Sequence, residues 1–258
     1  DTDRSRGLGD VYKRQIYHRI LLLANIHPAV TGFCPGKSVS DNARVHLGRK
    51  NVLKVDLHDF FPSIRSPRVR AAFREMGYSR SIAKVLAELC CLRCCLPQGA
   101  PTSPALSNII AYPMDKKMMA LAGEYGLVYT RYADDLTFSG DYLPKDEVLV
   151  RIHRIIREEG FTMNVKKTRF LSEHKRKIIT GVSVSSGKKI TLPKVKKREI
   201  RKNVHYVLTK GLVGHQEHIG STDPVYLKRL LGSLCYWRSI EPDNRYVSDS
   251  ITALKRLM

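Results

Sequence analysis

Two short apolar runs flank a pair of acids in the segment L-V-Y-T-R-Y-A-D-D-L-T-F-S, residues 127–139. The runs cover 127–133 and 136–139, and Asp134 and Asp135 lie between them. Apolar, β-branched and aromatic residues on both sides of a polar turn predict a β-hairpin. Adjacent aspartates most often serve as a turn or a cap, so their chemical meaning depends on the rest of the chain.

A third acid stands at the end of another predicted strand. Residues 51–57 read N-V-L-K-V-D-L, and this alternation predicts a strand with Asp56 near its end. Asp56, Asp134 and Asp135 would then meet at one edge of a sheet, where their mutual repulsion favours divalent cations. Oxygen ligands suit Mg²⁺, and two such ions about 3.5–4 Å apart can activate a hydroxyl and neutralise a departing pyrophosphate. The acids therefore predict a two-magnesium site for nucleotidyl transfer.

The other patterns predict an α+β fold. Ser-Pro dipeptides at 66–67 and 103–104 combine an N-cap with a proline suited to the first helical position. Short strands are expected around the turn at 186–187. Helices are expected at 67–76, 81–91, 103–121, 144–159, 194–210 and 224–237. Together these elements predict an antiparallel sheet with helices on one face and a helical appendage.

The composition is that of a globular, strongly basic protein. The 258 residues are 43% hydrophobic and 27% charged, and 45 Lys and Arg against 24 Asp and Glu give a net charge of +21. Such a charge favours polyanionic partners, with nucleic acid ahead of an acidic membrane, although a merely soluble basic protein is the alternative. No apolar run is long enough to span a bilayer and no signal core follows the N-terminus, so we expect a cytoplasmic protein without a membrane partner.

Four of the six cysteines crowd into residues 90–95, C-C-L-R-C-C. This crowding makes a disulfide framework awkward, and nothing indicates a secreted protein. Structural zinc is an alternative, but no second cluster of Cys or His follows nearby. We therefore expect reduced thiols.

The most basic segment lies near the C-terminus and predicts a helix that contacts phosphates. Like charges on one helix repel each other unless phosphates lie opposite them, so RNA binding is the interpretation and an unengaged surface helix the alternative. Its basic residues are Lys194, Lys196, Lys197, Arg198, Arg201 and Lys202.

Three motifs, in this order and spacing, resemble those of reverse transcriptases. Residues 55–61, V-D-L-H-D-F-F, resemble the first metal-binding strand of that family. Residues 96–104, L-P-Q-G-A-P-T-S-P, resemble its loop and helix that support nucleotide and template. Residues 132–135, Y-A-D-D, resemble its catalytic hairpin. The resemblance implies an RNA-directed DNA polymerase of right-hand shape, with a palm, partial fingers and a helical thumb. It also implies that Asp56 and Asp134 are the principal ligands of two Mg²⁺ ions, with Asp135 completing the catalytic cluster.

The same resemblance implies nucleotide-binding roles for Phe61, Gln98, Gly99 and Lys167. Phe61 falls where the family places an aromatic ring against the sugar, and a ring there offers a 2′-hydroxyl neither space nor a partner. Gln98 and Gly99 resemble the pair that contacts the nucleotide. Lys167, in the segment N-V-K-K-T at 164–168, resembles a lysine near the triphosphate. Deoxynucleoside triphosphates are the implied substrates.

Two further elements are similar to those of the bacterial retron branch. Residues 42–46, N-A-R-V-H, resemble its Asn-Ala-x-x-His element, and 179–181, I-T-G, approximate its Val-Thr-Gly element. This branch implies a cognate structured noncoding RNA as template and primer, an RNA–DNA hybrid as product, and an association with defence against phage. Asn42 and His46 would then join the basic helix as RNA-binding residues.

The resemblance divides the chain into four segments. Residues 1–15 are expected to be a non-native or disordered start, because they are polar and stand where the family has fingers strands. Residues 16–50 would hold residual fingers and a retron-like insert, 51–192 the palm with finger helices, and 193–258 the basic helical thumb. An N-terminal truncation of this kind would weaken polymerisation.

Three other functions are compatible with these motifs. A non-retron, group II intron-like reverse transcriptase would share the catalytic residues. An RNA-dependent RNA polymerase also uses paired aspartates, although Phe61 argues against it, and an RNA-binding protein could keep the fold without polymerisation. The sequence identifies neither the template RNA, the priming nucleotide, the oligomeric state nor an effector partner.

Overall fold

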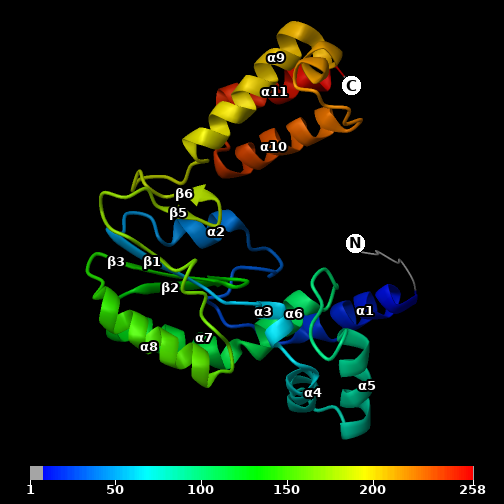
Figure 1. The fold of residues 1–258 in the computed structure, drawn as a ribbon, viewed down its shortest axis with the longest axis vertical. Helices are drawn as coiled ribbons and strands as arrows, with labels where there is room; N and C mark the ends of the chain where they lie inside the picture. Colours follow the sequence, from blue (N-terminus) through cyan, green and yellow to red (C-terminus); the bar gives the residue numbers. More distant parts are fainter. Residues whose placement is uncertain (1–7, 258) are drawn as a thin grey trace.

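The computed structural model describes residues 8–257, and its centre is a four-stranded antiparallel sheet (Figure 1). The strand order is β2-β3-β1-β4. The strands are β1 (Asn51–Asp56), β2 (Val128–Tyr132), β3 (Asp135–Gly140) and β4 (Arg169–Leu171). The α+β class and the hairpin expected at 127–139 are therefore confirmed.

The hairpin turn lies one residue earlier than the sequence pattern indicates. Tyr132 pairs with Asp135, so the turn residues are Ala133 and Asp134, and Asp135 already belongs to β3. Ala133 has a φ of 56°, in the left-handed region. Two-residue hairpins require positive φ in the turn to match the twist of the strands. An alanine in this conformation costs free energy, which the surrounding contacts must supply.

The two faces of the sheet meet different layers. Leu53 and Val55 of β1 lie opposite Phe138 and Leu136 of β3, and all four belong to the main hydrophobic core. Helices α7 (Tyr112–Glu124) and α8 (Lys145–Glu158) cover this face (Figure 1). Side chains alternate along a strand, so Lys54 and Asp56 belong to the other face. The short helix α2 (Val39–Arg44) packs against that second face.

A group of helices lies at one end of the sheet. The helices expected at 67–76 and 81–91 are confirmed as α4 and α5, and the Ser79 side chain caps α5 by accepting from the backbone N–H of Ile82. The group consists of α1 (Leu8–Arg19), η1 (Leu21–Leu23), α3 (Phe60–Ser63), α4 (Ser66–Glu75), α5 (Arg80–Cys90) and α6 (Ser103–Ile110).

The single helix expected over 103–121 is in fact two helices. α6 ends at Ile110 and α7 begins at Tyr112. Pro113 explains the break, because proline has no N–H to continue the ladder and its ring clashes with the carbonyl four residues earlier. Each helix brings its own side chain to the hairpin: Asn108 comes from α6 and Asp115 from α7.

The C-terminal helices form a unit with a hydrophobic core of its own around the buried Trp237. The helix expected at 194–210 extends to residue 218, with a kink at Gly211, where φ is 76°. The last helix, which begins at Arg245, was not expected from the sequence. The unit contains α9 (Lys194–His218), α10 (Tyr226–Ile240) and α11 (Arg245–Lys255), and the small sheet of β5 (Ile178–Ile179) and β6 (Val182–Ser183) shares its core.

The start of the described chain differs from the expectation of disorder. Residues 8–15 are helical, because they belong to α1, where Arg14 pairs with Asp10 at 3.4 Å and Ile16 is buried in the main core. Residues 1–7 lie outside the described part of the chain. Within residues 8–257, no helix has the length and apolar character needed to span a bilayer.

Candidate active site

The three acids singled out by the sequence lie together at the ends of neighbouring strands. Asp56 is the last residue of β1 and stands directly opposite Asp135 in the pairing register. The backbone N–H of Leu57 donates to the carbonyl oxygen of Asp134 at 3.0 Å. This bond ties the hairpin turn to the end of β1 and brings all three carboxyl groups to one edge of the sheet.

The electrostatics of this edge favour a bound cation. Burial raises the pKa of Asp134, and the Asp135 and Asp56 carboxylates raise it further. Burial also raises the pKa of Asp135, the nearby Lys54 opposes this shift, and Asp56 adds to it. Such upward shifts mean that the protein itself does not compensate the negative charge, so a positive ion would be stabilising here.

Asp56 is buried and only half satisfied. Its Oδ2 accepts a hydrogen bond from the Lys167 ammonium at 3.3 Å, whereas its Oδ1 is buried without a donor. The loop that carries Lys167 is docked on the strand end, because the N–H of Asn164 donates to the carbonyl oxygen of Asp56 at 2.7 Å. This backbone hydrogen bond therefore holds the loop so that the Lys167 ammonium lies beside the Asp56 carboxylate.

The donor set fits divalent cations, although the chain does not form a closed metal cage. Among residues 8–257, no three His, Cys, Asp or Glu side chains come together in an arrangement that would hold a metal ion. The buried, unpaired Oδ1 of Asp56 nevertheless lies beside two carboxyl groups with raised pKa, and a hard cation would satisfy all of them. Asp56, Asp134 and Asp135 are thus the acids that would supply ligands to magnesium, although the side chains of the described residues are not gathered into a complete ligand set.

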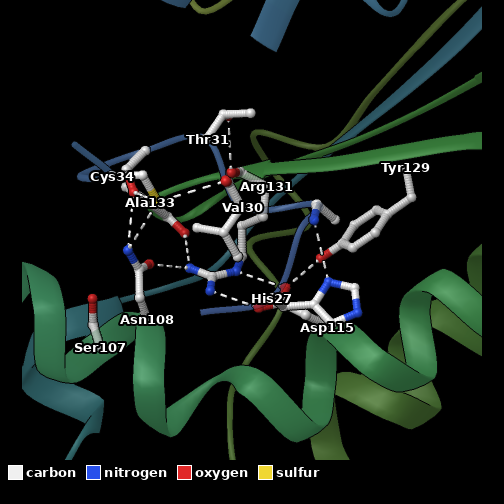
Figure 2. Close-up of polar contacts among 12 residues, drawn as sticks. His27, Val30, Thr31, Cys34, Ser107, Asn108, Asp115, Tyr129, Arg131 and Ala133 are labelled. Carbon is white, nitrogen blue, oxygen red and sulfur yellow. Dashed lines mark hydrogen bonds and ion pairs between the residues drawn. The ribbon is translucent and has the colours of Figure 1, made fainter. Parts of the chain in front are cut away.

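A buried ion pair holds the hairpin turn (Figure 2). Arg131 of β2 and Asp115 of α7 are both 0% exposed, and the guanidinium donates to the two carboxylate oxygens at 2.8 and 2.7 Å. The same guanidinium donates to the carbonyl oxygen of Ala133 and to the side-chain oxygen of Asn108, both at 3.1 Å. Because Asn108 belongs to α6, both helices take part in positioning the residue that precedes Asp134.

The segment at residues 29–34 supports the hairpin from its outer edge. The N–H of Thr31 donates to the carbonyl oxygen of Arg131 at 2.9 Å, and the N–H of Arg131 donates to that of Ala29 at 3.0 Å. A Cβ atom at Gly32 would lie 2.6 Å from the backbone nitrogen of Ala133. Only glycine permits this close approach to the turn.

Sequence reasoning missed this supporting network. One signal was available, because Arg131 lies two residues after Tyr129 on a predicted strand and so shares its apolar face. A charge at a position that the pattern predicts to be buried requires a buried partner. The identity of that partner, Asp115, could not be read from the sequence, since it lies on a different element.

Phe61 lies in α3, in a row of aromatic rings that leads to the hairpin. Its ring centroid is 5.6 Å from that of Phe60 and 6.1 Å from that of Phe33. Phe33 is in turn 6.2 Å from Tyr132, the first residue of the Y-A-D-D motif. No sequence pattern singled out Phe33. In the structure its side chain is 41% exposed and its φ is 60°, which is uncommon for a bulky residue.

Gln98 and Gly99 are exposed in the loop before α6. Gly99 has a φ of 84°, so glycine suits this turn. Ser103 anchors the loop by donating to the carbonyl oxygen of Pro97 at 2.7 Å. Among the contacts of the described residues, none joins Gln98 to the three acids.

Asn42 and His46, which the resemblance implies to be RNA-binding residues, are buried inside the protein. Asn42 is 1% exposed, and it accepts from Thr31 at 2.9 Å and donates to Thr180 at 3.2 Å. The two retron-like elements, 42–46 and 179–181, therefore meet in space through this asparagine. Its role in the structure is to join elements rather than to contact a partner.

His46 is 0% exposed and bridges β2 and β3. Its Nδ1 lies 2.6 Å from the hydroxyl of Ser139, and its Nε2 lies 2.8 Å from the hydroxyl of Thr130. Burial, as the main cause, and the nearby Arg49 together lower the pKa of His46 to about 4. A neutral, fully enclosed imidazole offers RNA neither a charge nor an exposed edge.

Two of the basic residues of α9 serve the packing of the helical unit. The Lys197 ammonium is 2.7 Å from Oε1 of Glu241 and 5.6 Å from the Trp237 ring centroid. The Arg201 guanidinium lies over the rings of Trp237 and Tyr246, at 5.5 and 5.0 Å. These contacts tie Lys197 to the end of α10, and Arg201 to both α10 and α11.

Arg201 is exposed despite these contacts, and so are the remaining lysines and arginines of α9. Lys196 pairs with Glu199 on the same helix at 3.0 Å. Lys194, Arg198 and Lys202 follow one another at intervals of four and form no ion pair with another described residue. Because this spacing aligns them on one side of the helix, they form a basic face that phosphates could reach.

Comparison with known proteins gives a consistent result. A family model described as "Reverse transcriptase (RNA-dependent DNA polymerase)" matches residues 6–207. The chain is 37% identical over 206 residues to a retron Ec86 reverse transcriptase of Escherichia coli, which covers 79% of this chain and 63% of that protein. It is 36% identical over 238 residues to a retron Mx65 reverse transcriptase of Myxococcus xanthus, covering 84% of this chain and 53% of that protein.

The chain therefore spans 63% and 53% of the lengths of these two relatives. Among solved structures, an apo telomerase from Candida tropicalis, truncated from its C-terminal domain, aligns with a TM-score of 0.49 at 10% identity. That alignment covers 72% of this chain and 44% of the telomerase chain.

Proposed function

The chain belongs to the reverse transcriptase family, whose model matches residues 6–207, and on that premise we propose that it is an RNA-directed DNA polymerase. It extends a primer along an RNA template by joining deoxynucleotides. The observation that carries the proposal is the pairing of Asp56 with Asp135 beside the turn residue Asp134, together with the buried Oδ1 of Asp56 that no donor satisfies. Partly buried carboxylates gathered at one sheet edge cost folding free energy unless a cation binds to them.

Divalent metal ions are the cofactor class of this family, and we propose two Mg²⁺ ions held by Asp56, Asp134 and Asp135. Bound magnesium supplies a lowered pKa at the attacking hydroxyl and neutralises charge on the departing pyrophosphate. The chain contributes the positions of the three carboxylates, which the Arg131–Asp115 pair and the Leu57 N–H fix through the turn. Preorganisation of this kind lowers the barrier because few groups must reorient during the reaction.

Phe61 is proposed to select deoxynucleotides. Its ring is part of the aromatic row next to the hairpin, so a sugar placed at the acids would meet an apolar surface. A 2′-hydroxyl against this ring would lose its hydrogen bonds to water without gaining a partner. The penalty falls on ribonucleotides and leaves deoxynucleotides unaffected.

Lys167, Gln98 and Gly99 are proposed to bind the triphosphate and the base. The Lys167 ammonium sits 3.3 Å from Asp56 and would exchange this carboxylate for phosphate oxygens when a nucleotide binds. Gln98 carries an amide with both donor and acceptor atoms on an exposed loop, and Gly99 lets the backbone approach closely. Both residues precede α6, the helix that also carries Asn108 of the supporting network.

The RNA is proposed to be a structured noncoding RNA that serves as both template and primer, as in retrons, with a role in defence against phage. The support is the similarity to proteins named as retron reverse transcriptases and the contact of the two retron-like elements through Asn42 and Thr180. In this proposal residues 51–192 act as the palm and 193–258 as the thumb. The basic face Lys194–Arg198–Lys202 would hold RNA phosphates.

Primer extension on an RNA template tests the proposed activity. Wild-type protein with Mg²⁺ should incorporate deoxynucleotides, and Asp134→Asn should lose at least about a hundredfold in rate, more than the change of an outer-shell group costs. Asp146→Asn is the control, because this side chain is 95% exposed on α8 and removes the same charge. Extension that survives Asp134→Asn would refute the metal-site assignment, and no extension by wild type would favour an RNA-binding protein.

The nucleotide preference gives a second test. Phe61→Ala should raise the incorporation of ribonucleotides relative to deoxynucleotides by roughly 10–200-fold, the range that one steric contact can discriminate. Phe60→Leu serves as the control, because its ring is buried in the core next to Phe61. If the ratio stays at its wild-type value in Phe61→Ala, another residue selects the sugar.

A further inference from the structure

A groove runs between α4 and α5, outside the candidate active site. The two helices pack against each other through buried residues such as Val69 and Ala83, and their outer sides leave a cavity of about 630 Å³. Pro67 and Ala71 provide a small apolar lining. The polar lining consists of Arg70, Arg74, Arg80, Ser81 and Lys84.

The positive charge of this groove has almost no counter-charge. No acid lines the cavity. Among the described residues, Arg70, Arg74 and Arg80 form no ion pair, and Arg74 donates only to the carbonyl oxygen of Tyr78 at 3.2 Å. Lys84 lies 3.9 Å from Glu88, but both side chains are more than half exposed, and an exposed pair of this kind contributes little.

The arrangement opposes the stability of the helices that carry it. Arg70 and Arg74 on α4, and Arg80 and Lys84 on α5, are both like-charge pairs at i, i+4, which destabilise a helix. The two pairs also face one another across the groove. An anionic ligand with several charges would turn this repulsion into attraction, whereas a single carboxylate would compensate only one of the four charges.

We propose that the α4–α5 groove binds the sugar–phosphate backbone of RNA, at a site separate from the one at which RNA is copied. The inference rests on the proposed function, because it takes the RNA partner from there. The guanidinium fork binds phosphate oxygens in pairs, and residues at i and i+4 lie about 5–6 Å apart, so they can reach successive phosphates of one strand. The lining offers no aromatic ring on which a base could stack, which favours the backbone over the bases as the ligand.

The place of the groove in the fold supports a separate contact. α4 and α5 lie at the opposite end of the long axis from α9, α10 and α11 (Figure 1). None of the three acids or the proposed nucleotide-binding residues lines the cavity. An RNA held at both ends of the molecule would be fixed on either side of the catalytic hairpin, with its copied portion between the two contacts.

The salt dependence of RNA binding tests the groove. Affinity for a fluorescein-labelled RNA stem-loop is measured by anisotropy over a series of KCl concentrations, for wild type and for Arg70→Gln/Arg74→Gln. Two lost phosphate contacts should lower the slope of log K against log salt by about 1.4–1.8. Glutamine is a good helix former, so the helix itself should persist.

Arg154→Gln/Arg157→Gln is the matched control, because it removes two exposed arginines from one face of α8 and changes the net charge equally. In this control, the slope of log K against log salt should change by less than half as much as in Arg70→Gln/Arg74→Gln. Equal changes in the two double variants, or no change in either, would show that the groove binds RNA no better than any basic surface and would overturn the proposal.

Two further variants remove the remaining ambiguities. If Arg70→Gln/Arg74→Gln fails to fold, Arg80→Gln/Lys84→Gln tests the same groove from α5 and should give a similar loss of slope. Asp134→Asn should retain the wild-type slope, because the groove does not depend on the acids. Groove binding and DNA synthesis can therefore fail separately. If wild type synthesises DNA but Arg70→Gln/Arg74→Gln keeps the wild-type salt slope, the groove proposal alone is rejected. If that variant loses slope but wild type synthesises no DNA, the polymerase proposal alone is rejected.

Discussion

The Arg131 guanidinium joins three parts of the molecule: the strand β2, Asp115 on α7 and the carbonyl oxygen of the turn residue Ala133. A fully buried charge is costly, and it is tolerated only when every donor finds a partner. Here Asp115, Asn108 and the Ala133 carbonyl accept four hydrogen bonds of 2.7–3.1 Å from the guanidinium. The consequence is a turn whose position is set by side chains from outside the hairpin.

Removing one member of this pair should therefore cost far more than removing a surface pair. We expect Asp115→Asn to lower the free energy of unfolding by about 3–5 kcal/mol, because Arg131 keeps a buried charge without its counter-ion. Urea denaturation measures the change. Glu124→Gln is the control: it breaks the exposed pair between Glu124 and Arg151 and should cost at most about 1 kcal/mol. Similar costs for the two variants would contradict the role of burial.

His46 should make stability depend on pH in the acid range. Its folded pKa of about 4 lies below the ordinary value of 6.5, so the unfolded chain binds a proton that the folded chain refuses. The contribution is therefore constant above pH 6.5 and is lost as the pH falls from 6.5 towards 4. Between pH 7 and pH 5 the loss from this residue is about 2 kcal/mol.

Urea denaturation at the two pH values measures this dependence. His46→Gln keeps hydrogen-bonding groups but cannot titrate, so the difference in unfolding free energy between pH 7 and pH 5 should shrink by about that amount. An unchanged difference in the variant would mean that other groups cause the acid sensitivity.

Residues whose role is expressed in sequence spacing could be predicted, and residues whose role depends on a distant partner could not. Asp134 and Asp135 are neighbours in a hairpin that the local pattern predicts, whereas the meeting of Asp56 with them was expected from its place at a strand end and from the order of the family motifs. Asn42 and His46 belong to a motif, but their partners Thr180 and Ser139 lie 138 and 93 residues away. Burial of these two side chains therefore depends on the tertiary fold.

At the scale of elements, the hairpin and the segment at 29–34 act as one unit. Backbone bonds from Thr31 and to Ala29 add this segment to the edge of β2, and Gly32 lets it lie against the turn. The positive φ of Ala133 is maintained in this enclosed position. A loss of contact with the segment would leave the strained turn with fewer restraints, and the position of Asp134 with it.

Gly32→Ala should disturb this unit. The added Cβ would lie 2.6 Å from the backbone nitrogen of Ala133, so either the segment or the turn must move. Overpacking of this kind costs about 1–3 kcal/mol, and a shifted turn should also lower the rate of primer extension. Gly123→Ala is the control: a Cβ there meets nothing within 4 Å, and the residue lies in α7, so stability should rise by up to about 1 kcal/mol. Equal stability of the two variants would argue against the close contact.

Helix starts were predicted better than helix ends and continuations. Ser79 and the prolines after Ser66 and Ser103 are local signals, and each marks the beginning of a helix. The division of α6 from α7 also has a local cause in Pro113, which the periodic pattern of 103–121 concealed. The continuation of α9 past Gly211 has no such signal, because glycine usually ends a helix and here only kinks it.

Over the whole molecule, the excess positive charge is divided among distinct surfaces. The sequence suggested one uniform basic helix at 194–202, but the structure separates its basic residues by their contacts: Lys197 and Arg201 lie against α10 and α11, although Arg201 stays exposed, whereas Lys194, Arg198 and Lys202 form no such contacts. Lys197 binds Glu241, and both Lys197 and Arg201 lie over the Trp237 ring, which a charge count cannot reveal. Lys197 and Arg201 are therefore engaged within the protein, which leaves Lys194, Arg198 and Lys202 as the charges that are freest to meet a polyanion.

This division predicts opposite effects for two sets of substitutions in α9. Lys194→Gln/Arg198→Gln/Lys202→Gln should lower the salt slope of RNA binding by about 2, close to the value for three lost phosphate contacts, and leave the unfolding free energy within about 0.5 kcal/mol of wild type. Lys197→Gln/Arg201→Gln should do the reverse, because it removes a half-buried ion pair and three contacts with aromatic rings while Lys194, Arg198 and Lys202 stay intact. Anisotropy titrations and urea denaturation of both variants measure the two effects. If the double variant weakens RNA binding as much as the triple variant at unchanged stability, then Lys197 and Arg201 leave Trp237 for the RNA, and the separation of the α9 basic residues into these two sets is wrong.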